Sequence, residues 1–123
     1  IQPIGFCPIG SPTRPDRDKD PNDVVDMQMP ELVEIAKAHN VHPAIICLKW
    51  AVQRGQTPIP FSIYENEYTS NLRCVTEDPL TEEEMKIMTS LDRNCRFIKG
   101  HVFLWEGAED WYDLWDLDGT ITK

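Results

Sequence analysis

The sequence predicts an α/β fold built on a parallel sheet, and two observations lead to this prediction. Residues 4–8 and 57–62 are short apolar runs bounded by turn residues, which is typical of buried strands. Stretches with helical spacing of apolar residues follow each run. Strands that alternate with helices form parallel sheets covered by those helices. Because two strands cannot close such a sheet, the chain is expected to be part of a larger unit, with a part upstream of Ile1.

The segment after the first predicted strand differs sharply from its neighbours. Residues 11–29 are rich in Pro, Asp and other charged side chains, so they are not expected to bury enough apolar surface to form regular structure. Loops of this length often cover a ligand, or else are simply mobile. The sequence leaves both alternatives open for this flexible loop.

Four helices are predicted from their end signals. Pro30 and Pro43 each fit the first turn of a helix, and these helices should end near Asn40 and at Gly55. A third helix begins near Glu65. A fourth begins with a capping box formed by Thr81 and Glu84, and ends near Asn94. The apolar faces of the four are Leu32, Ile35, Ala36 and His39; Ile45, Leu48 and Val52; Tyr68, Leu72 and Val75; and Met85, Met88 and Leu91.

The composition excludes several classes of partner. Twenty-one acidic and twelve basic residues give a formal net charge of -9, which repels nucleic acid and anionic lipid surfaces. No apolar run is long enough to span a bilayer. The four cysteines form no C-x-x-C pair and lie among apolar residues, so core thiols are favoured over a metal site. A reducing, cytoplasmic setting is therefore expected.

Four stretches in this order resemble the aldo-keto reductase family: residues 5–12 (GFCPIGSP), 43–55 (PAIICLKWAVQRG), 59–62 (IPFS) with Asn71 following, and 80–97. The resemblance implies that residues 1–97 are the C-terminal portion of a (β/α)8 TIM-type barrel, a fold that takes about 250 residues when complete. Residues 98–123 are then a C-terminal tail. The remainder of the barrel is expected upstream or in a partner chain.

The resemblance implies that the first motif binds a nicotinamide dinucleotide. Phe6 takes the place of the aromatic ring that stacks on the nicotinamide, and Ser11 with the backbone around Ile9 and Gly10 faces the diphosphate. Cys7 belongs to the same expected cofactor-binding set. The alternative is that Phe6 is an ordinary core residue.

The second motif departs from the family pattern. By resemblance, Ser62, Ile63 and Asn71 are cofactor-binding residues, but Phe61 and Glu67 stand where NADP-binding members have the Lys and Arg that hold the 2′-phosphate. Glu67 would repel that phosphate, whereas it could accept a hydrogen bond from the 2′-hydroxyl of NAD.

The cofactor is therefore expected to be NAD or NADP, with NADP binding weakened. Arg73 could supply the missing cation, and Glu67 could equally be a solvated residue on a helix face.

The resemblance implies reduction of aldehydes or ketones, with a small carbonyl compound as substrate. No position matches the family's catalytic Tyr, Lys, Asp and His, so no catalytic residue is predicted in this chain. Trp105 and Trp111 could line the substrate pocket, although Trp111 and Trp115 also fit one face of a short helix. The competing interpretation is a non-catalytic interaction or regulatory protein that has lost cofactor binding.

Overall fold

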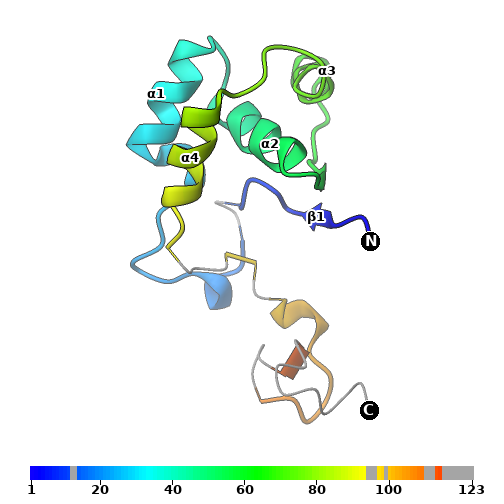
Figure 1. Cartoon of the computed structure of the whole chain (residues 1–123). Coiled ribbons are helices and arrows are strands. Elements are labelled where there is room, and N and C mark those ends of the chain that lie inside the picture. The colour runs from blue at the N-terminus through cyan, green and yellow to red at the C-terminus, as the bar shows by residue number, and fades with distance from the viewer. Residues whose placement is uncertain (12–13, 94–96, 99, 110–112, 115–123) are drawn as a thin grey trace.

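The computed structural model describes residues 1–11, 14–93, 97–98, 100–109 and 113–114. Two strands and four α-helices follow one another in the predicted order (Figure 1). Their bounds are β1 (Ile4–Phe6), α1 (Pro30–Ala38), α2 (Pro43–Gln53), β2 (Thr57–Ile59), α3 (Glu65–Arg73) and α4 (Glu82–Ser90). Three single-turn 3-10 helices, η1 (Asp16–Asp18), η2 (Asp26–Gln28) and η3 (His101–Phe103), complete the described elements.

The two strands pair in parallel, as the alternation of strands and helices predicts. Ile4 is opposite Thr57, and Phe6 is opposite Ile59. Both strands are shorter than predicted. β1 stops before Cys7, which has a φ of 49°, outside the extended region. β2 stops before Pro60, whose nitrogen carries no hydrogen for a strand hydrogen bond.

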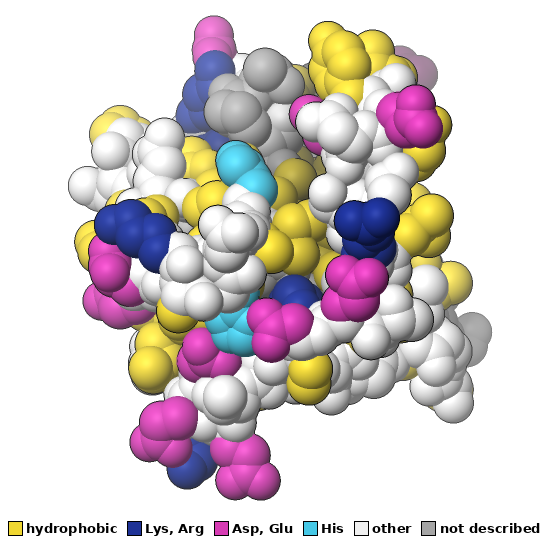
Figure 2. Space-filling view, turned by 90° about the horizontal axis from the view of Figure 1, so that it is seen from above, with side chains coloured by type: hydrophobic (Ala, Val, Ile, Leu, Met, Phe, Trp, Pro, Cys, Tyr) yellow, Lys and Arg dark blue, Asp and Glu magenta, His cyan; other side chains and the backbone are white. Residues whose placement is uncertain are grey.

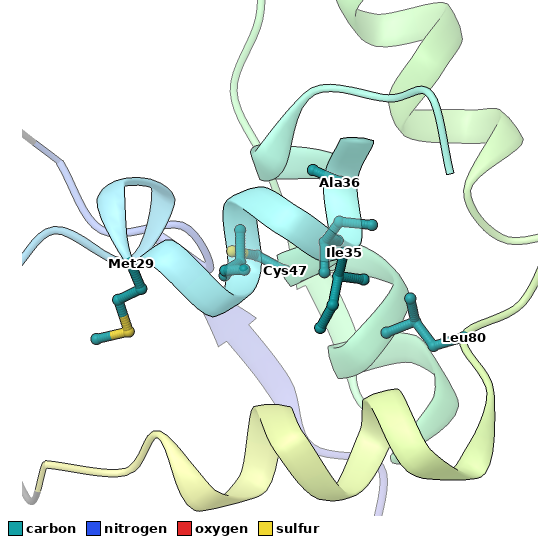
Figure 3. Close-up of a cluster of buried hydrophobic side chains, with 7 residues drawn as sticks. Met29, Ile35, Ala36, Cys47 and Leu80 are labelled. Atoms are coloured by element: carbon teal, nitrogen blue, oxygen red, sulfur yellow. The ribbon is translucent and has the colours of Figure 1, made fainter. Parts of the chain in front are cut away.

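The hydrophobic core lies between α1, α2 and α4. Leu32, Ile35 and Ala36 of α1 are buried, which confirms the predicted face of this helix. Figure 3 shows side chains of α1, α2 and the segment before α4 converging on one cluster, which includes Cys47 and Leu80. Met85, Met88 and Leu91 pack against this cluster as predicted. The central helix α2 is buried on more sides than its predicted face, since Ile46, Cys47 and Lys49 are buried as well.

The helix ends follow the local sequence signals. Asn40 and Gly55 adopt left-handed conformations, with φ of 51° and 79°, just after α1 and α2. The Thr81 and Glu84 capping box is present at the start of α4. This helix ends at Ser90, earlier than predicted, and the predicted end at Asn94 lies outside the described residues.

The expectation that residues 11–29 contain no regular structure is wrong in part. Two 3-10 turns form here, η1 and η2, and each is closed by a backbone hydrogen bond from the residue that follows it. Side chains reinforce the chain between them, since Asp20 accepts a hydrogen bond from the backbone of Asn22 and its own N–H donates to Asp23. Local hydrogen bonds of Asp side chains therefore replace the apolar burial that this segment lacks.

The side of the fold that carries the strands and α3 is apolar and exposed. Large hydrophobic side chains on the strands, on the residues after β2 and on α3 reach solvent: Ile4, Phe6, Ile59, Phe61, Ile63, Tyr68 and Leu72. Figure 2 shows hydrophobic side chains interspersed with acidic and basic ones on one face of the molecule. Parallel strands are normally covered on both faces, so this sheet is bare compared with those of complete α/β domains.

A polar clasp connects α1 with α4 and with the loop before it. His39 lies at the end of α1, with Nδ1 2.5 Å from Asp78 Oδ2 and Nε2 3.0 Å from Glu84 Oε1. Nearby, the buried Lys49 donates from Nζ to the carbonyl oxygens of Glu77, at 2.5 Å, and Asp78. Burial of the His39 ring disfavours its charged form, but the hydrogen bonds with Asp78 and Glu84 outweigh burial and raise the pKa of His39.

The core assignment predicts unequal costs for two leucine truncations. Leu32→Ala should lower the free energy of unfolding by about 2–5 kcal/mol, because Leu32 is only 1% exposed. The matched control Leu72→Ala, at a position that is 72% exposed, should change it by less than about 0.5 kcal/mol. Urea denaturation followed by circular dichroism measures both, and equal losses would contradict the core.

The clasp predicts that stability depends on pH through His39. Because its pKa is raised on folding, its stabilisation should be complete below about pH 6.5 and should be lost as the pH rises through the folded pKa. His39→Gln should remove this part of the slope. The melting temperatures of the unmodified protein and of His39→Gln are measured from below to above the pKa of His39. If the melting temperatures of both proteins change with pH in the same way, His39 does not contribute to the pH dependence.

Candidate functional site

The parallel pairing brings the ends of the two strands to one edge of the sheet. Phe6 and Ile59 are register partners, so the chain leaves both strands at the same carboxyl edge. The expected cofactor-binding residues lie at these ends or follow them: residues 6–11 at and after the end of β1, and residues 62–71 after β2 and on α3. Ligands of parallel α/β folds bind at this edge.

An open pocket of about 630 Å3 lies beside the end of β1. One side is formed by the strand and the turn that follows it. The other side comes from residues far along the chain. Its lining residues are Ile4, Phe6, Cys7, Pro8, Gly10, Asp26, Phe97, Ile98, Gly100, Phe103 and Leu114. Of these, the sequence motif indicated Phe6 and Cys7 as site residues, and the backbone of Gly10 as facing the diphosphate.

The four expected site residues of the first motif have different surroundings. Phe6 is 70% exposed, on the same uncovered sheet as Ile4 and Ile59. Cys7 lines the pocket with Phe6. Ile9 packs against the core cluster between α1, α2 and α4 and against a second buried cluster of Ile45, Leu48 and Cys74, so its side chain supports the turn. The carbonyl oxygen of Ser11 accepts a hydrogen bond from Arg14 Nη1 at 3.0 Å.

The second motif forms a small hydrogen-bonded turn. Ser62 Oγ donates to Glu67 Oε2 at 2.5 Å and accepts from the backbone N–H of Tyr64 at 3.2 Å. Glu67 lies in the first turn of α3 and is exposed, as is Ile63, whereas Asn71 is half-buried. Arg73, considered as a source of the missing cation, lies 4.0 Å from Glu77 through its Nε. None of these residues lines the pocket beside β1.

A buried cluster centred on Arg14 was not predicted. The Arg14 side chain is only 5% exposed, and its guanidinium pairs with Asp23, whose side chain is 8% exposed. Arg14 Nε donates to the carbonyl oxygen of Asp18 at 3.2 Å, and the guanidinium carbon lies 4.9 Å from the centre of the Phe97 ring. The abundance of Asp around Arg14 could have suggested a local ion pair, but nothing in the sequence marks Phe97 as its neighbour.

A second unpredicted contact reaches across the chain. His101 Nδ1 donates to Asp18 Oδ1 at 2.5 Å, and the two side chains are 18% and 8% exposed. In Figure 1 the segment after α4, drawn in gold, passes beside the blue segment that contains η1. Eighty-three positions separate the two residues. No local pattern in a sequence can reveal such a pair.

The electrostatics of the pocket are set in part by Asp26. This carboxyl group lines the pocket, and burial raises its pKa. Burial raises the pKa of the Cys47 thiol to about 12, and the charge of Asp26 acts in the same direction. Cys47 is therefore an inert core thiol at neutral pH, as the sequence predicted. Cys74 is buried as well and Cys7 partly, while Cys95 lies outside the described residues.

The aromatic residues of the tail are placed only in part. Trp105 is 52% exposed and does not line the pocket. The aromatic residues that line it from this part of the chain are Phe97 and Phe103. Trp111, Tyr112 and Trp115 lie outside the described residues. In the part of the chain that the structure describes, no group of three or more His, Cys, Asp or Glu could hold a metal ion. No described helix is long and apolar enough to cross a membrane.

Comparison with known proteins identifies relatives over most of the chain. The sequence model of the Aldo/keto reductase family matches residues 1–93. Aldo-keto reductase family 1 member A1-A of Danio rerio is 34% identical over 108 residues, which is 88% of this chain and 32% of the relative.

Two mammalian proteins give a similar result. Member A1 of Sus scrofa is 35% identical, covering 80% of this chain and 29% of the relative. Member C4 of Homo sapiens is 38% identical, covering 64% and 24%. The chain therefore spans about a third or less of the length of these curated relatives.

The raised pKa of Asp26 predicts a stabilising substitution. Ionised Asp26 is disfavoured by burial, so stability should fall as the pH rises from the unfolded pKa near 3.8 through the higher folded pKa. Asp26→Asn should therefore raise the melting temperature at pH 7, and the gain should disappear below about pH 3, where the Asp26 carboxyl is neutral in both the folded and the unfolded protein. A gain of equal size at both pH values would contradict burial as the cause.

Proposed function

Because the chain belongs to the aldo-keto reductase family, we propose that it forms part of the nicotinamide-dinucleotide site of an oxidoreductase that reduces aldehydes or ketones to alcohols. One observation carries this proposal. The parallel pairing of β1 and β2 brings the ends of both motifs to one edge of the sheet, and the exposed aromatic ring of the first motif lines an open pocket there. The substrate would be a small carbonyl compound.

The residues present fit a dinucleotide at the nicotinamide end of the proposed site. The Phe6 ring is exposed at the pocket and offers a face on which a planar ring can stack. A nicotinamide cofactor supplies the hydride for carbonyl reduction when it is bound. The part of this chain is to bind and orient it. The proton donor for the product alcohol belongs to the family's catalytic residues, which match no position of this sequence.

The fit at the adenosine end favours NAD over NADP. Glu67 stands at the position expected to face the 2′ substituent, and its carboxylate already accepts a hydrogen bond from Ser62. A 2′-phosphate there would meet a negative charge. Arg73 is already paired with another carboxylate, since its Nε lies 4.0 Å from Glu77 Oε1. A 2′-hydroxyl could donate to the carboxylate instead.

The exposed apolar sheet supports the proposal that further barrel elements cover it, either upstream in the chain or in a partner chain. Ile4, Ile59 and Ile63 are exposed along the strands and just after β2, where a complete barrel has neighbouring strands and filled layers of side chains. We also propose a cytoplasmic setting, since the thiols of Cys7, Cys47 and Cys74 are free.

The alternative function, a non-catalytic interaction protein derived from a barrel, is favoured by the same Phe61 and Glu67 exchanges. It differs in one measurable respect, because it predicts binding of neither dinucleotide. Titration of the complete barrel, in which the further elements accompany this chain, with NADH and NADPH separates the two functions when it is followed by energy transfer from tryptophan to the nicotinamide.

The charge argument predicts how a substitution changes cofactor choice. Glu67→Arg should shift the ratio of dissociation constants toward NADPH by about tenfold or more, because it replaces repulsion with a charge-assisted hydrogen bond. Glu65→Arg is the matched control, since it makes the same charge change in the same helical turn. Clearly tighter NADPH binding by the unmodified protein, or equal effects of the two variants, would overturn the assignment of Glu67.

A further inference from the structure

The connection between α3 and α4, residues 74–81, is held to the rest of the chain largely by polar contacts. Cys74 and Leu80, near its two ends, are buried, and the residues between them are exposed. From α2, Lys49 donates to two carbonyl oxygens of the connection, and Gln53 exchanges hydrogen bonds with the backbone of Leu80 at 2.8 and 2.9 Å. In Figure 1 this connection runs from α3 past α2 to the start of α4. Hydrogen bonds thus hold the part that apolar burial does not reach.

Asp78, in the middle of the connection, has a backbone conformation that needs support from its surroundings. Its φ is 46°, in the left-handed region that few residues with a side chain adopt. Its carboxylate contacts the ring of His39, whose Nδ1 lies 2.5 Å from Asp78 Oδ2. The Asp78 side chain is 62% exposed, so water can replace the histidine wherever this contact weakens.

His39 faces a second carboxylate, which is held more firmly. Its Nε2 lies 3.0 Å from Glu84 Oε1. The other oxygen of Glu84 accepts hydrogen bonds from the backbone N–H and the hydroxyl of Thr81, at 2.8 and 2.9 Å. The Glu84 side chain is also only 17% exposed. Glu84 therefore keeps its place whether or not His39 donates to it.

The charged groups near the ring come from several elements. The connection contributes Asp78 and α4 contributes Glu84, and both carboxylates contact the ring. The cation that α2 brings to this region is Lys49, whose ammonium group is directed to backbone oxygens of the connection. The remaining charged side chains of this region pair with each other, Lys37 with Glu34 on α1 and Arg73 with Glu77.

A neutral histidine cannot donate to both carboxylates. The neutral ring has one N–H and one bare nitrogen, and a carboxylate only accepts, so one of the two contacts then sets a lone pair against an oxygen. Because Glu84 is fixed and Asp78 is exposed, the remaining N–H is expected to stay with Glu84, and the contact with Asp78 is lost. Burial opposes the charged ring, but the two carboxylates outweigh it and raise the pKa of His39, so this loss occurs above about pH 6.5.

The connection continues directly from α3, which has little other support within the described chain. No residue of α3 is buried. Cys74, the residue after this helix, is buried in a cluster with Ile45 and Leu48 of α2. Cys74 and the connection therefore hold the C-terminal end of α3 on α2. An opening of the connection would release the half of α3 that carries Asn71.

We propose that His39 is a positioning residue that acts as a proton-dependent clasp. The protonated ring fixes Asp78 and keeps the C-terminal end of α3 packed on α2, and loss of the proton releases both. Glu67 and Asn71 lie on α3, so the affinity for the adenosine end of a dinucleotide falls as the clasp opens. This last step rests on the proposed function, whereas the opening of the connection does not.

Two substitutions should move the clasp in opposite directions. His39→Leu donates to neither carboxylate, so the connection should be open at every pH. Asp78→Asn supplies an N–H for the bare Nδ1 of a neutral His39 and an oxygen for the protonated ring, so the connection should stay closed at every pH. Asn also tolerates the left-handed backbone at this position. The matched control is His42→Asn, which removes another imidazole but keeps a side-chain acceptor at the start of α2.

Hydrogen exchange of the complete barrel reports the opening without any ligand. The amides of Thr76, Glu77 and Leu80 are hydrogen-bonded in the closed connection, to Arg73 and Gln53, and should be protected there. Between about pH 6 and about pH 9, their protection factors in the unmodified protein should fall about tenfold relative to those of α2.

The variants give the comparison its direction. His39→Leu should show the low protection at both pH values, and Asp78→Asn should show the high protection at both. His42→Asn should follow the unmodified protein. If His39→Leu does not fold, Asp78→Asn against the unmodified protein decides the test, because the two are expected to differ only at the higher pH.

NADH affinity of the same proteins tests the coupling to the proposed site. The dissociation constant should rise about fivefold between the two pH values in the unmodified protein and in His42→Asn. In Asp78→Asn it should stay at the low-pH value. NADH is the probe because its diphosphate does not titrate in this range, unlike the 2′-phosphate of NADPH.

The outcomes separate the clasp from the function. Protection that is independent of pH in the unmodified protein, or that still falls with pH in Asp78→Asn, would overturn the clasp. A connection that opens as expected in a barrel that binds neither NADH nor NADPH would support the clasp and overturn the proposed function. Opening without any change in NADH affinity would overturn the coupling between the clasp and the dinucleotide.

Discussion

The parallel pairing of β1 with β2 is the constraint on which the rest of the structure depends. Each strand has only three residues, and more than fifty positions separate their starts. The helices α1 and α2 lie between the two strands in the sequence. The buried α2 leads into β2 through the left-handed Gly55, so the packing of α1 and α2 fixes where β2 lies. The register of Phe6 with Ile59 then brings two motifs to one edge. A one-residue slip would turn the side chains of a strand to the opposite face of the sheet and separate the motifs.

Sequence reasoning succeeded where the cause of a structure is local. Pro30 and Pro43 start helices, Asn40 and Gly55 end them, and Thr81 with Glu84 caps α4, because each depends on residues within one turn. The site was less predictable. Phe6 and Cys7 of the first motif line the pocket, but Phe97 and Phe103 line it from the far end of the chain. The contact of His101 with Asp18 depends on the tertiary fold alone, so no local pattern could reveal it.

The buried cations of this acidic chain are used to hold loops. Lys49 donates to the carbonyl oxygens of Glu77 and Asp78 before α4, and Arg14 binds Asp23 with the carbonyl oxygens of Ser11 and Asp18. Burying a charge is unfavourable unless partners replace water, and each of these cations has at least two protein acceptors. Both loops are poor in apolar side chains. Charge-assisted hydrogen bonds therefore fix segments that the hydrophobic effect cannot fix.

Position 67 shows how local stability and ligand choice can change together. Glu67 lies in the first turn of α3, where the positive end of the helix dipole stabilises a carboxylate, and Ser62 donates a hydrogen bond to it. An Arg at the same place would oppose the dipole unless a bound phosphate compensated for it. A cation at this position thus depends on a ligand, whereas Glu67 is stabilised by the protein itself. The exchange therefore strengthens the turn after β2 and, at the proposed site, removes the counter-charge that a 2′-phosphate needs.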